Sequence, residues 1–145
     1  MSGSRADNIK IIFKTFRHDI ETYEDEKTEE EYEGVMKKIG DTTYVMYEET
    51  DPDDKKVTKN LLKISRDRLE RECSGEKKSV MVFKAGSETR TSYKTPYGTF
   101  HLRFTTTYMD IAENDSGTVV SLEYMMSYDN GPVADCRMEI ILKQS

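Results

Sequence analysis

The chain contains few side chains of the types that carry out acid–base or nucleophilic chemistry at neutral pH. Its two histidines, His18 and His101, fall on expected strand positions that face away from the apolar residues. A cysteine nucleophile needs a base within hydrogen-bond reach, and no spacing brings a histidine next to Cys73 or Cys136. We therefore predict no catalytic residues.

The sequence also offers no set of metal ligands. The run from Asp51 to Asp54 resembles the start of a calcium loop, but such a loop needs glycine at its sixth position and glutamate at its twelfth. Those positions hold Lys56 and Leu62, so the run predicts a turn. Without a close group of cysteines and histidines a transition-metal site has no support, and we predict neither a metal nor a cofactor.

Hydroxyl-bearing side chains on an expected inner face give the best functional indication. We expect the strand faces that carry Leu102 and Phe104 to carry four such residues as well: Thr106, Tyr108, Tyr124 and Tyr128. Buried tyrosine hydroxyls need hydrogen-bond partners, and a barrel of eight strands has room for side chains or for one small ligand. These groups either bond one another in a filled barrel or line an amphipathic pocket. Tyr97, in the turn-forming run Thr95-Pro96-Tyr97-Gly98, is a further candidate at the barrel rim.

Strict alternation of apolar and polar residues predicts the elements that position these groups. A period of two is typical of a strand with one buried face. The pattern occurs in three successive segments, at Phe100, Leu102, Phe104, Thr106 and Tyr108, at Val120, Leu122, Tyr124, Met126 and Tyr128, and at Ala134, Cys136, Met138, Ile140 and Leu142. Short runs rich in Gly, Asn and Asp separate them, as expected of hairpin turns.

Turn-forming residues recur about every ten residues along the rest of the chain, which is the spacing of a sandwich or barrel. Reading strands between them predicts residues 8–20, 28–39, 42–50, 56–65, 68–74, 77–84, 89–95, 98–111, 117–128 and 131–143. Short turns imply antiparallel neighbours, and closure removes exposed sheet edges. We predict an all-β fold, an antiparallel meander barrel of about 8–10 strands, with residues 1–7 as a flexible tail and 8–145 as one domain.

The glutamate-rich stretch from Glu21 to Glu31 does not fit this pattern. Glutamate favours helices, but like charges four residues apart, such as Glu26 and Glu30, repel each other. The two-residue alternation resumes at Tyr32, so we predict a long acidic hairpin loop here.

Composition excludes several partners. Charged residues make up 34% of the 145 residues and the net charge is −6, whereas nucleic-acid binding needs a basic face. No apolar stretch approaches the roughly 20 residues needed to cross a bilayer, and the first residues do not resemble a secretory signal. Two cysteines are too few to stabilise a secreted fold, so we expect reduced thiols. We predict neither nucleic acid nor membrane as a partner.

The order of three segments carries a family likeness that extends from about residue 9 to residue 143. These segments are residues 40–49, 95–102 and 121–124. On them the sequence resembles the YwiB-like proteins, an uncharacterised bacterial family of calycin-like β-barrels. The resemblance implies a lipocalin-type barrel in a cytoplasmic protein and brings no established active site with it.

Three functional hypotheses follow. The first is a barrel that holds a small, partly apolar molecule in its interior. The second is a protein-interaction or self-association module, such as a homodimer, that uses the acidic stretch or an outer face expected to carry Met109, Val119, Met125 and Ile141. The third, an enzyme, requires a carboxylate such as Glu48 or Glu123 beside an arginine or histidine in a cleft.

Overall fold

The structure is a computed structural model that describes residues 6–74, 79–129 and 131–144, apart from the side chains of residues 93–95. Within these ranges it contains ten strands and no helix: β1 (Asp7–Asp19), β2 (Asp25–Ile39), β3 (Thr42–Thr50), β4 (Val57–Ser65), β5 (Arg68–Ser74), β6 (Ser79–Lys84), β7 (Ser87–Thr95), β8 (Gly98–Asn114), β9 (Gly117–Tyr128) and β10 (Gly131–Gln144). All ten predicted strands are present, so the all-β prediction is confirmed. Of the predicted tail, residues 1–5 lie outside the described part and Asp7 already belongs to β1. No helix among the described residues is long and apolar enough to cross a membrane.

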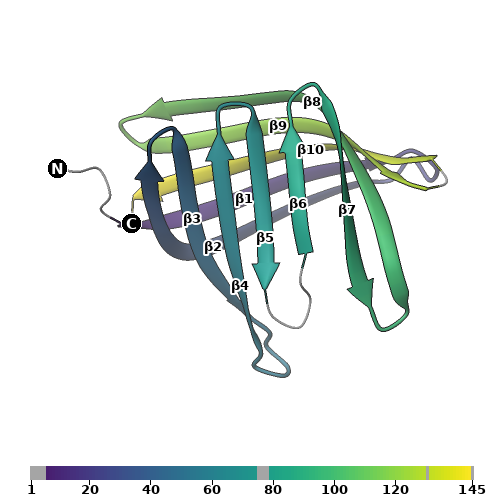
Figure 1. Cartoon of the computed structure of the whole chain (residues 1–145), viewed down its shortest axis with the longest axis horizontal. Helices are drawn as coiled ribbons and strands as arrows, with labels where there is room; N and C mark the ends of the chain where they lie inside the picture. The colour runs from purple at the N-terminus through teal and green to yellow at the C-terminus, as the bar shows by residue number, and fades with distance from the viewer. Residues whose placement is uncertain (1–5, 75–78, 130, 145) are drawn as a thin grey trace.

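Every strand pairs antiparallel with its neighbours in one continuous sheet. The order is β6-β5-β4-β3-β2-β1-β10-β9-β8-β7, so only the pairing of β1 with β10 departs from chain order. This pairing joins the first and last strands in the middle of the sheet (Figure 1). The sheet curls round until its two outermost strands, β6 and β7, approach each other. The molecule is therefore a nearly closed meander barrel.

The seam between β6 and β7 is the place where closure is incomplete. The structure describes the backbone of all of β6 and β7, and among these described residues no backbone ladder joins the two strands. The short turn between the two strands forms backbone hydrogen bonds with other parts of the sheet. The Ala85 amide donates to the Asp67 carbonyl, and the Gly86 amide donates to the Thr106 carbonyl. Instead, the Thr89 and Thr91 hydroxyls donate to the carbonyls of Val82 and Val80. Side chains thus replace the backbone bonds at this seam.

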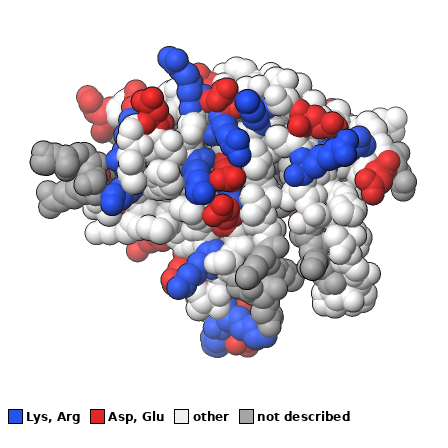
Figure 2. All heavy atoms as spheres, in the orientation of Figure 1, with Lys and Arg blue, Asp and Glu red and all other residues white. Residues whose placement is uncertain are grey.

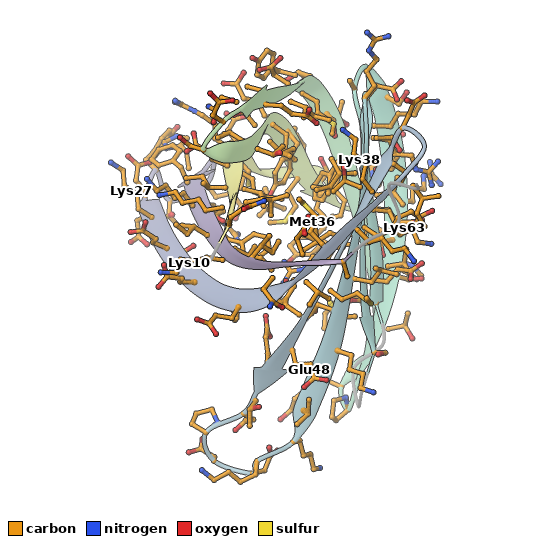
Figure 3. The ribbon with its side chains drawn as sticks, turned by 90° about the vertical axis from the view of Figure 1, so that its left-hand side faces the viewer. Lys10, Lys27, Met36, Lys38, Glu48 and Lys63 are labelled. Carbon is orange, nitrogen blue, oxygen red and sulfur yellow. The ribbon has the colours of Figure 1, made fainter. Side chains whose placement is uncertain are left out.

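The inward faces of the strands form one apolar core. Its fully buried members include residues from β1, β4, β5, β6, β9 and β10, namely Ile9, Ile11, Leu62, Leu69, Phe83, Leu122, Ile140 and Leu142. Side chains crowd the space enclosed by the strands, with Met36 pointing into it and Lys10 and Lys27 pointing away (Figure 3). Burial of these residues supplies the main driving force for folding.

The predicted acidic loop is wrong for most of its length, because β2 begins at Asp25. Its glutamates pair across to β1, where Lys10 lies 3.7 Å from Glu31 and Lys14 lies 4.0 Å from Glu29. Cross-strand pairs of opposite charge stabilise a sheet and offset repulsion among the glutamates. The sequence argument weighed charges within the stretch only and therefore missed the cations of the neighbouring strand.

A β-bulge in β8 overturns part of the predicted inner face. The register of β8 against β9 shifts between Thr106 and Tyr108, and a bulge of this kind adds one residue to one strand. After the shift the odd-numbered residues point inward, so Met109 packs against the core and Tyr108 lies outside. The prediction that Met109 lies on the outer face is therefore wrong.

The outer surface mixes both signs of charge. Figure 2 shows lysines and arginines interspersed with acidic side chains over the middle of the sheet. Lys63 on β4, for example, lies 3.4 Å from Glu70 and 3.3 Å from Glu72 on β5. Exposed pairs of this kind contribute little to stability, but they keep the surface solvated.

Candidate functional site

One layer of the barrel interior is polar. Tyr47, Asn60 and Cys73 are paired in register across β3, β4 and β5, so their side chains lie in one row. Arg71 shares their face of the sheet, because residues two apart on a strand point the same way. Tyr47 and Asn60 are each only 3% exposed. Four side chains capable of hydrogen bonding therefore meet within or beside the core.

Several polar atoms in this layer have no hydrogen-bond partner among the described residues. They are the Tyr47 hydroxyl, the Asn60 Nδ2 amide and the Arg71 Nε. The Asn60 carboxamide is oriented by its other end, because the Cys73 thiol donates to Asn60 Oδ1 at 2.9 Å. A buried polar group without a partner is rare and costs stability, so each instance calls for an explanation.

Arg71 brings a positive charge into this layer. Its guanidinium carbon lies 5.3 Å from the centre of the Phe13 ring, within the range of a cation–π contact. Its Nη2 lies 3.7 Å from a carboxylate oxygen of Glu49, which is too far for a strong hydrogen bond. The Arg71 side chain is 27% exposed, so solvent reaches the site at this end of the barrel.

Burial keeps the tyrosines of the interior in their neutral form. It raises the pKa of Tyr47 to about 12, although the positive charge of Arg71 opposes the rise. The charge of Arg71 acts on the Tyr47 hydroxyl, although the two groups are not in hydrogen-bond geometry. Burial also raises the pKa of Tyr32, helped by its hydrogen bond to Glu30, and that of Tyr124. At neutral pH these groups are hydrogen-bond donors rather than anions.

The opposite wall contains two of the residues predicted to bind a ligand. Thr106 and Tyr124 are both buried and are paired across β8 and β9. The Thr106 hydroxyl has no hydrogen-bond partner in the described part of the chain. Cys136 follows in the same row on β10. Burial raises the pKa of its thiol, although the nearby Tyr124 hydroxyl opposes the rise. A protonated, buried thiol is a poor nucleophile, in keeping with its predicted place in the core.

Aromatic rings surround the polar layer in two clusters. In the first, the Phe83 ring lies 4.7 Å from the Tyr124 ring and 4.8 Å from the Phe104 ring. In the second, the Tyr47 ring lies 4.8 Å from the Tyr32 ring and 5.6 Å from the Phe13 ring. The charge of Arg71 acts on tyrosines of both clusters. Aromatic side chains therefore fill the interior on both sides of the polar layer.

The other three predicted ligand-binding residues are not in the interior. Tyr108 is 47% exposed on the outer face, Tyr128 is 37% exposed at the end of β9, and Tyr97 is 93% exposed at the turn between β7 and β8. Phe100, expected inside, is also exposed. A role for any of them in binding stays a prediction, but it would have to be exercised at the surface.

Tyr108 instead lines a groove of about 690 Å³ on the outer face of β1, β2, β8, β9 and β10. A row of paired residues crosses it, running Lys27, Phe16, Arg137, Glu123 and Tyr108. The Phe16 ring lies between two cations, with Arg137 at 5.3 Å and Lys27 at 6.0 Å from its centre. The groove carries charges of both signs, so it does not select for one charge class of ligand.

The candidate catalytic groups lie on the outer surface. His18 Nδ1 is 2.6 Å from a carboxylate oxygen of Asp25, and both side chains are exposed. Glu123 lies 3.8 Å from Arg137, again with both side chains largely exposed. Glu48 is exposed as well. Across the described residues no group of three or more His, Cys, Asp or Glu side chains is arranged to hold a metal ion.

Sequence reasoning missed Tyr47, Asn60 and Arg71. Their signal was present, because Asn60 precedes Leu62 and Ile64 at the two-residue spacing of an inward face, and Arg71 follows Leu69 in the same way. A polar residue at an expected core position marks a candidate site.

The fold has a counterpart among solved structures. The crystal structure of the ywiB protein from Bacillus subtilis aligns with a TM-score of 0.83 and 20% sequence identity, covering 99% of this chain and 96% of that chain. At this identity the likeness shows the fold alone. Among curated proteins, no relative matches the chain. Residues 11–140 match the family described as Domain of unknown function (DUF1934). Because this match spans most of the sequence, the chain belongs to the DUF1934 family, as the resemblance to YwiB-like proteins had led us to expect.

Proposed function

We propose that this barrel binds a small, partly apolar molecule in its interior, in the layer that contains Tyr47, Asn60 and Arg71. The observation that carries the proposal is that the interior contains four of the five buried side-chain polar atoms that lack a partner among the described residues: Tyr47 Oη, Asn60 Nδ2, Arg71 Nε and, on the opposite wall, Thr106 Oγ1. A bound molecule that supplies their missing hydrogen bonds would remove the cost of burying them.

The surroundings of these atoms suit an amphipathic ligand. Aromatic rings flank the polar layer on both sides, and ligand sites are commonly apolar cavities with a few convergent polar groups. The partial exposure of Arg71 provides access from solvent. Analogy with lipocalin-type barrels, which hold a ligand in their interior, supports the same proposal, but fold analogy is weaker support than the site itself.

Native mass spectrometry of the protein purified from its own source tests the proposal directly. We expect the mass under gentle ionisation to exceed that of the denatured chain by the mass of one small molecule. Asn60→Leu removes an unpartnered amide at nearly constant volume and should lower the occupancy. Asn8→Leu, an exposed site on β1, is the matched control and should retain the molecule. A bare monomer from the source organism would contradict the proposal.

A second candidate function is self-association. Ile12, Ile141 and Val119 are paired side by side across β1, β10 and β9 on the outer face, and contiguous apolar groups on a surface favour protein contacts. The same mass spectrum tests this candidate, because a homodimer doubles the mass. Ile141→Lys would then restore the monomer, while Lys143→Ile on the same strand face would not.

We also infer that the protein resides in the cytoplasm. The inference rests on the likeness to YwiB-like proteins and on the two cysteines, which form no disulfide in the structure. Reduced thiols are typical of proteins from reducing compartments. Fractionation of source cells followed by immunoblotting would contradict the inference if the protein appeared outside the cytoplasmic fraction.

A further inference from the structure

We propose that the ligand is an organic acid and that the guanidinium of Arg71 binds its carboxylate. This inference rests on the proposed interior-binding function and adds the chemical class of the ligand. It follows from the kind of atom that lacks a partner, from the charge in the layer and from the rings around it.

The unpartnered atoms nearest Arg71 are donors. Arg71 Nε and Asn60 Nδ2 can only donate hydrogen bonds. The Asn60 oxygen accepts from the Cys73 thiol at 2.9 Å, and its Nδ2 amide has no partner among the described residues. The neutral hydroxyl of Tyr47 can donate as well. A ligand group that satisfies all three must be an acceptor with several lone pairs, and a carboxylate has two oxygens that meet this demand.

The charge of Arg71 is only partly compensated. Its ion pair with Glu49 spans 3.7 Å and involves Nη2, and its Nε has no hydrogen-bond partner among the described residues. Glu30 is already engaged by the Tyr32 hydroxyl. Burying a cation without good acceptors is costly, whereas a guanidinium edge forms strong paired bonds with a carboxylate. An incoming carboxylate would share Arg71 with Glu49 and accept the hydrogen bonds that Arg71 does not donate to the protein.

The rings around the layer specify the rest of the ligand. Phe13 lies under the Arg71 guanidinium, and the Tyr124 and Phe83 rings belong to the cluster on the other side. Aromatic faces and edges pack well against apolar or aromatic groups. The ligand is therefore a monocarboxylic acid with an apolar or aromatic body, rather than a sugar acid or a polyanion.

The test compares acids with neutral analogues of the same shape. Phenylacetate and hexanoate are each titrated against phenylacetamide and hexanamide, using the full-length protein and its tyrosine emission, which is readable because the chain has nine tyrosines and no tryptophan. We expect the acids to bind at least about tenfold more tightly than the amides, because hydrogen bonds between two charged groups are stronger than those to a neutral acceptor. Phenyl phosphate, offered in parallel, should bind more weakly than phenylacetate.

Substitution of Arg71 separates the ligand class from binding itself. Arg71→Met should lose the preference for acids and keep its affinity for the amides, whereas Arg71→Lys should retain part of the preference. Arg137→Met, at an exposed position on the outer face, is the control and should bind like the original protein. Circular dichroism and thermal unfolding establish that each variant is folded.

Two outcomes would overturn the assignment. If acids and amides bind equally and Arg71→Met changes neither, the ligand class is wrong while binding in the interior survives. If neither acid binds the original protein, the carboxylate assignment also fails. In that case the mass spectrum of the source-purified protein decides separately whether the interior binds any molecule.

Discussion

At the scale of single residues, the interior contains polar groups that folding alone does not explain. Tyr47 and Asn60 are buried as deeply as the apolar core, yet each leaves a polar atom without a partner. Natural cores usually satisfy such atoms. They lie beside an arginine whose charge is only partly compensated. We therefore interpret this layer as a binding site and not only as part of the packed core.

Removal of one unpartnered hydroxyl should not destabilise the ligand-free protein. Tyr47→Phe is expected to leave the free energy of unfolding unchanged or to raise it by about 1 kcal/mol, because a buried group without a partner has only its desolvation cost to lose. Tyr124→Phe removes a buried hydroxyl that interacts with the Cys136 thiol and should lower it by about 1 kcal/mol. Urea denaturation measures both. A clear loss of stability in Tyr47→Phe would mean that the hydroxyl has a protein partner.

The same hydroxyl should also shape the alkaline limit of stability. Tyrosine ionises near pH 10.0 in the unfolded chain, whereas burial raises the pKa of Tyr47 to about 12 in the folded protein. Between these values the unfolded state has lost a proton that the folded state keeps, so stability falls as the pH rises. Below pH 10 the group adds no slope. Tyr47→Phe should show a shallower decline in urea midpoints above pH 10, and identical slopes would contradict the expectation.

At the scale of elements, the bulge in β8 decides which side chains reach the interior. A bulge inserts one residue and reverses the alternation beyond it. This reversal moves Tyr108 to the outer groove and Met109 to the core. It also explains why the apolar pattern of β8 continues as Met109 and Ile111, one residue out of phase with Leu102 and Phe104.

Substitutions on the two faces of β8, just beyond the bulge, test its position. Tyr108→Ser should change the free energy of unfolding by less than about 0.5 kcal/mol, as for most surface sites. Met109→Ser removes a side chain packed on the core and should cost about 2 kcal/mol or more. Chemical denaturation of both variants gives the comparison. A larger loss for Tyr108→Ser would mean that the alternation runs through β8 without a shift.

At the scale of the whole molecule, the seam between β6 and β7 is the weakest line of the barrel. Every other pair of adjacent strands is joined by a backbone ladder, whereas this pair is held by the hydroxyls of Thr89 and Thr91. Local opening takes place where backbone hydrogen bonds are few. The seam lies beside the interior, because Phe83 on β6 belongs to the aromatic cluster of Tyr124.

Hydrogen exchange should detect this weakness. Backbone amides of β6 and β7 that face the seam are expected to exchange faster than those of β1 and β10, which pair on both sides. Thr91→Val keeps the shape of the side chain and removes its hydroxyl, so exchange in β6 should become faster still. Thr105→Val, exposed on β8, is the control and should leave β6 unchanged. Equal protection of β6 and β10 would show that the seam is closed.

The sequence by itself determined the ten strands, the antiparallel pairing of most chain neighbours and most of their inward faces. The predicted pairing of β6 with β7 was wrong, because the open seam lies between them. Alternation and turn residues are local properties, and they were sufficient to place Thr106 and Tyr124 in the interior. They also predicted β2 from residue 28 onward, whereas the strand begins at Asp25. The predicted acidic loop that overlaps its first half was wrong because it ignored the ion pairs with Lys10 and Lys14 of β1.

Only the tertiary structure decided which polar side chains meet. Tyr47, Arg71 and Tyr124 come from distant parts of the chain, and no local pattern states that β5 faces β9 across the barrel. The bulge carries no turn signature, so alternation alone could not reveal that Tyr108 leaves the interior. The open seam likewise depends on how far the whole sheet curls, because closure is set by the accumulated twist of ten strands and not by any one of them.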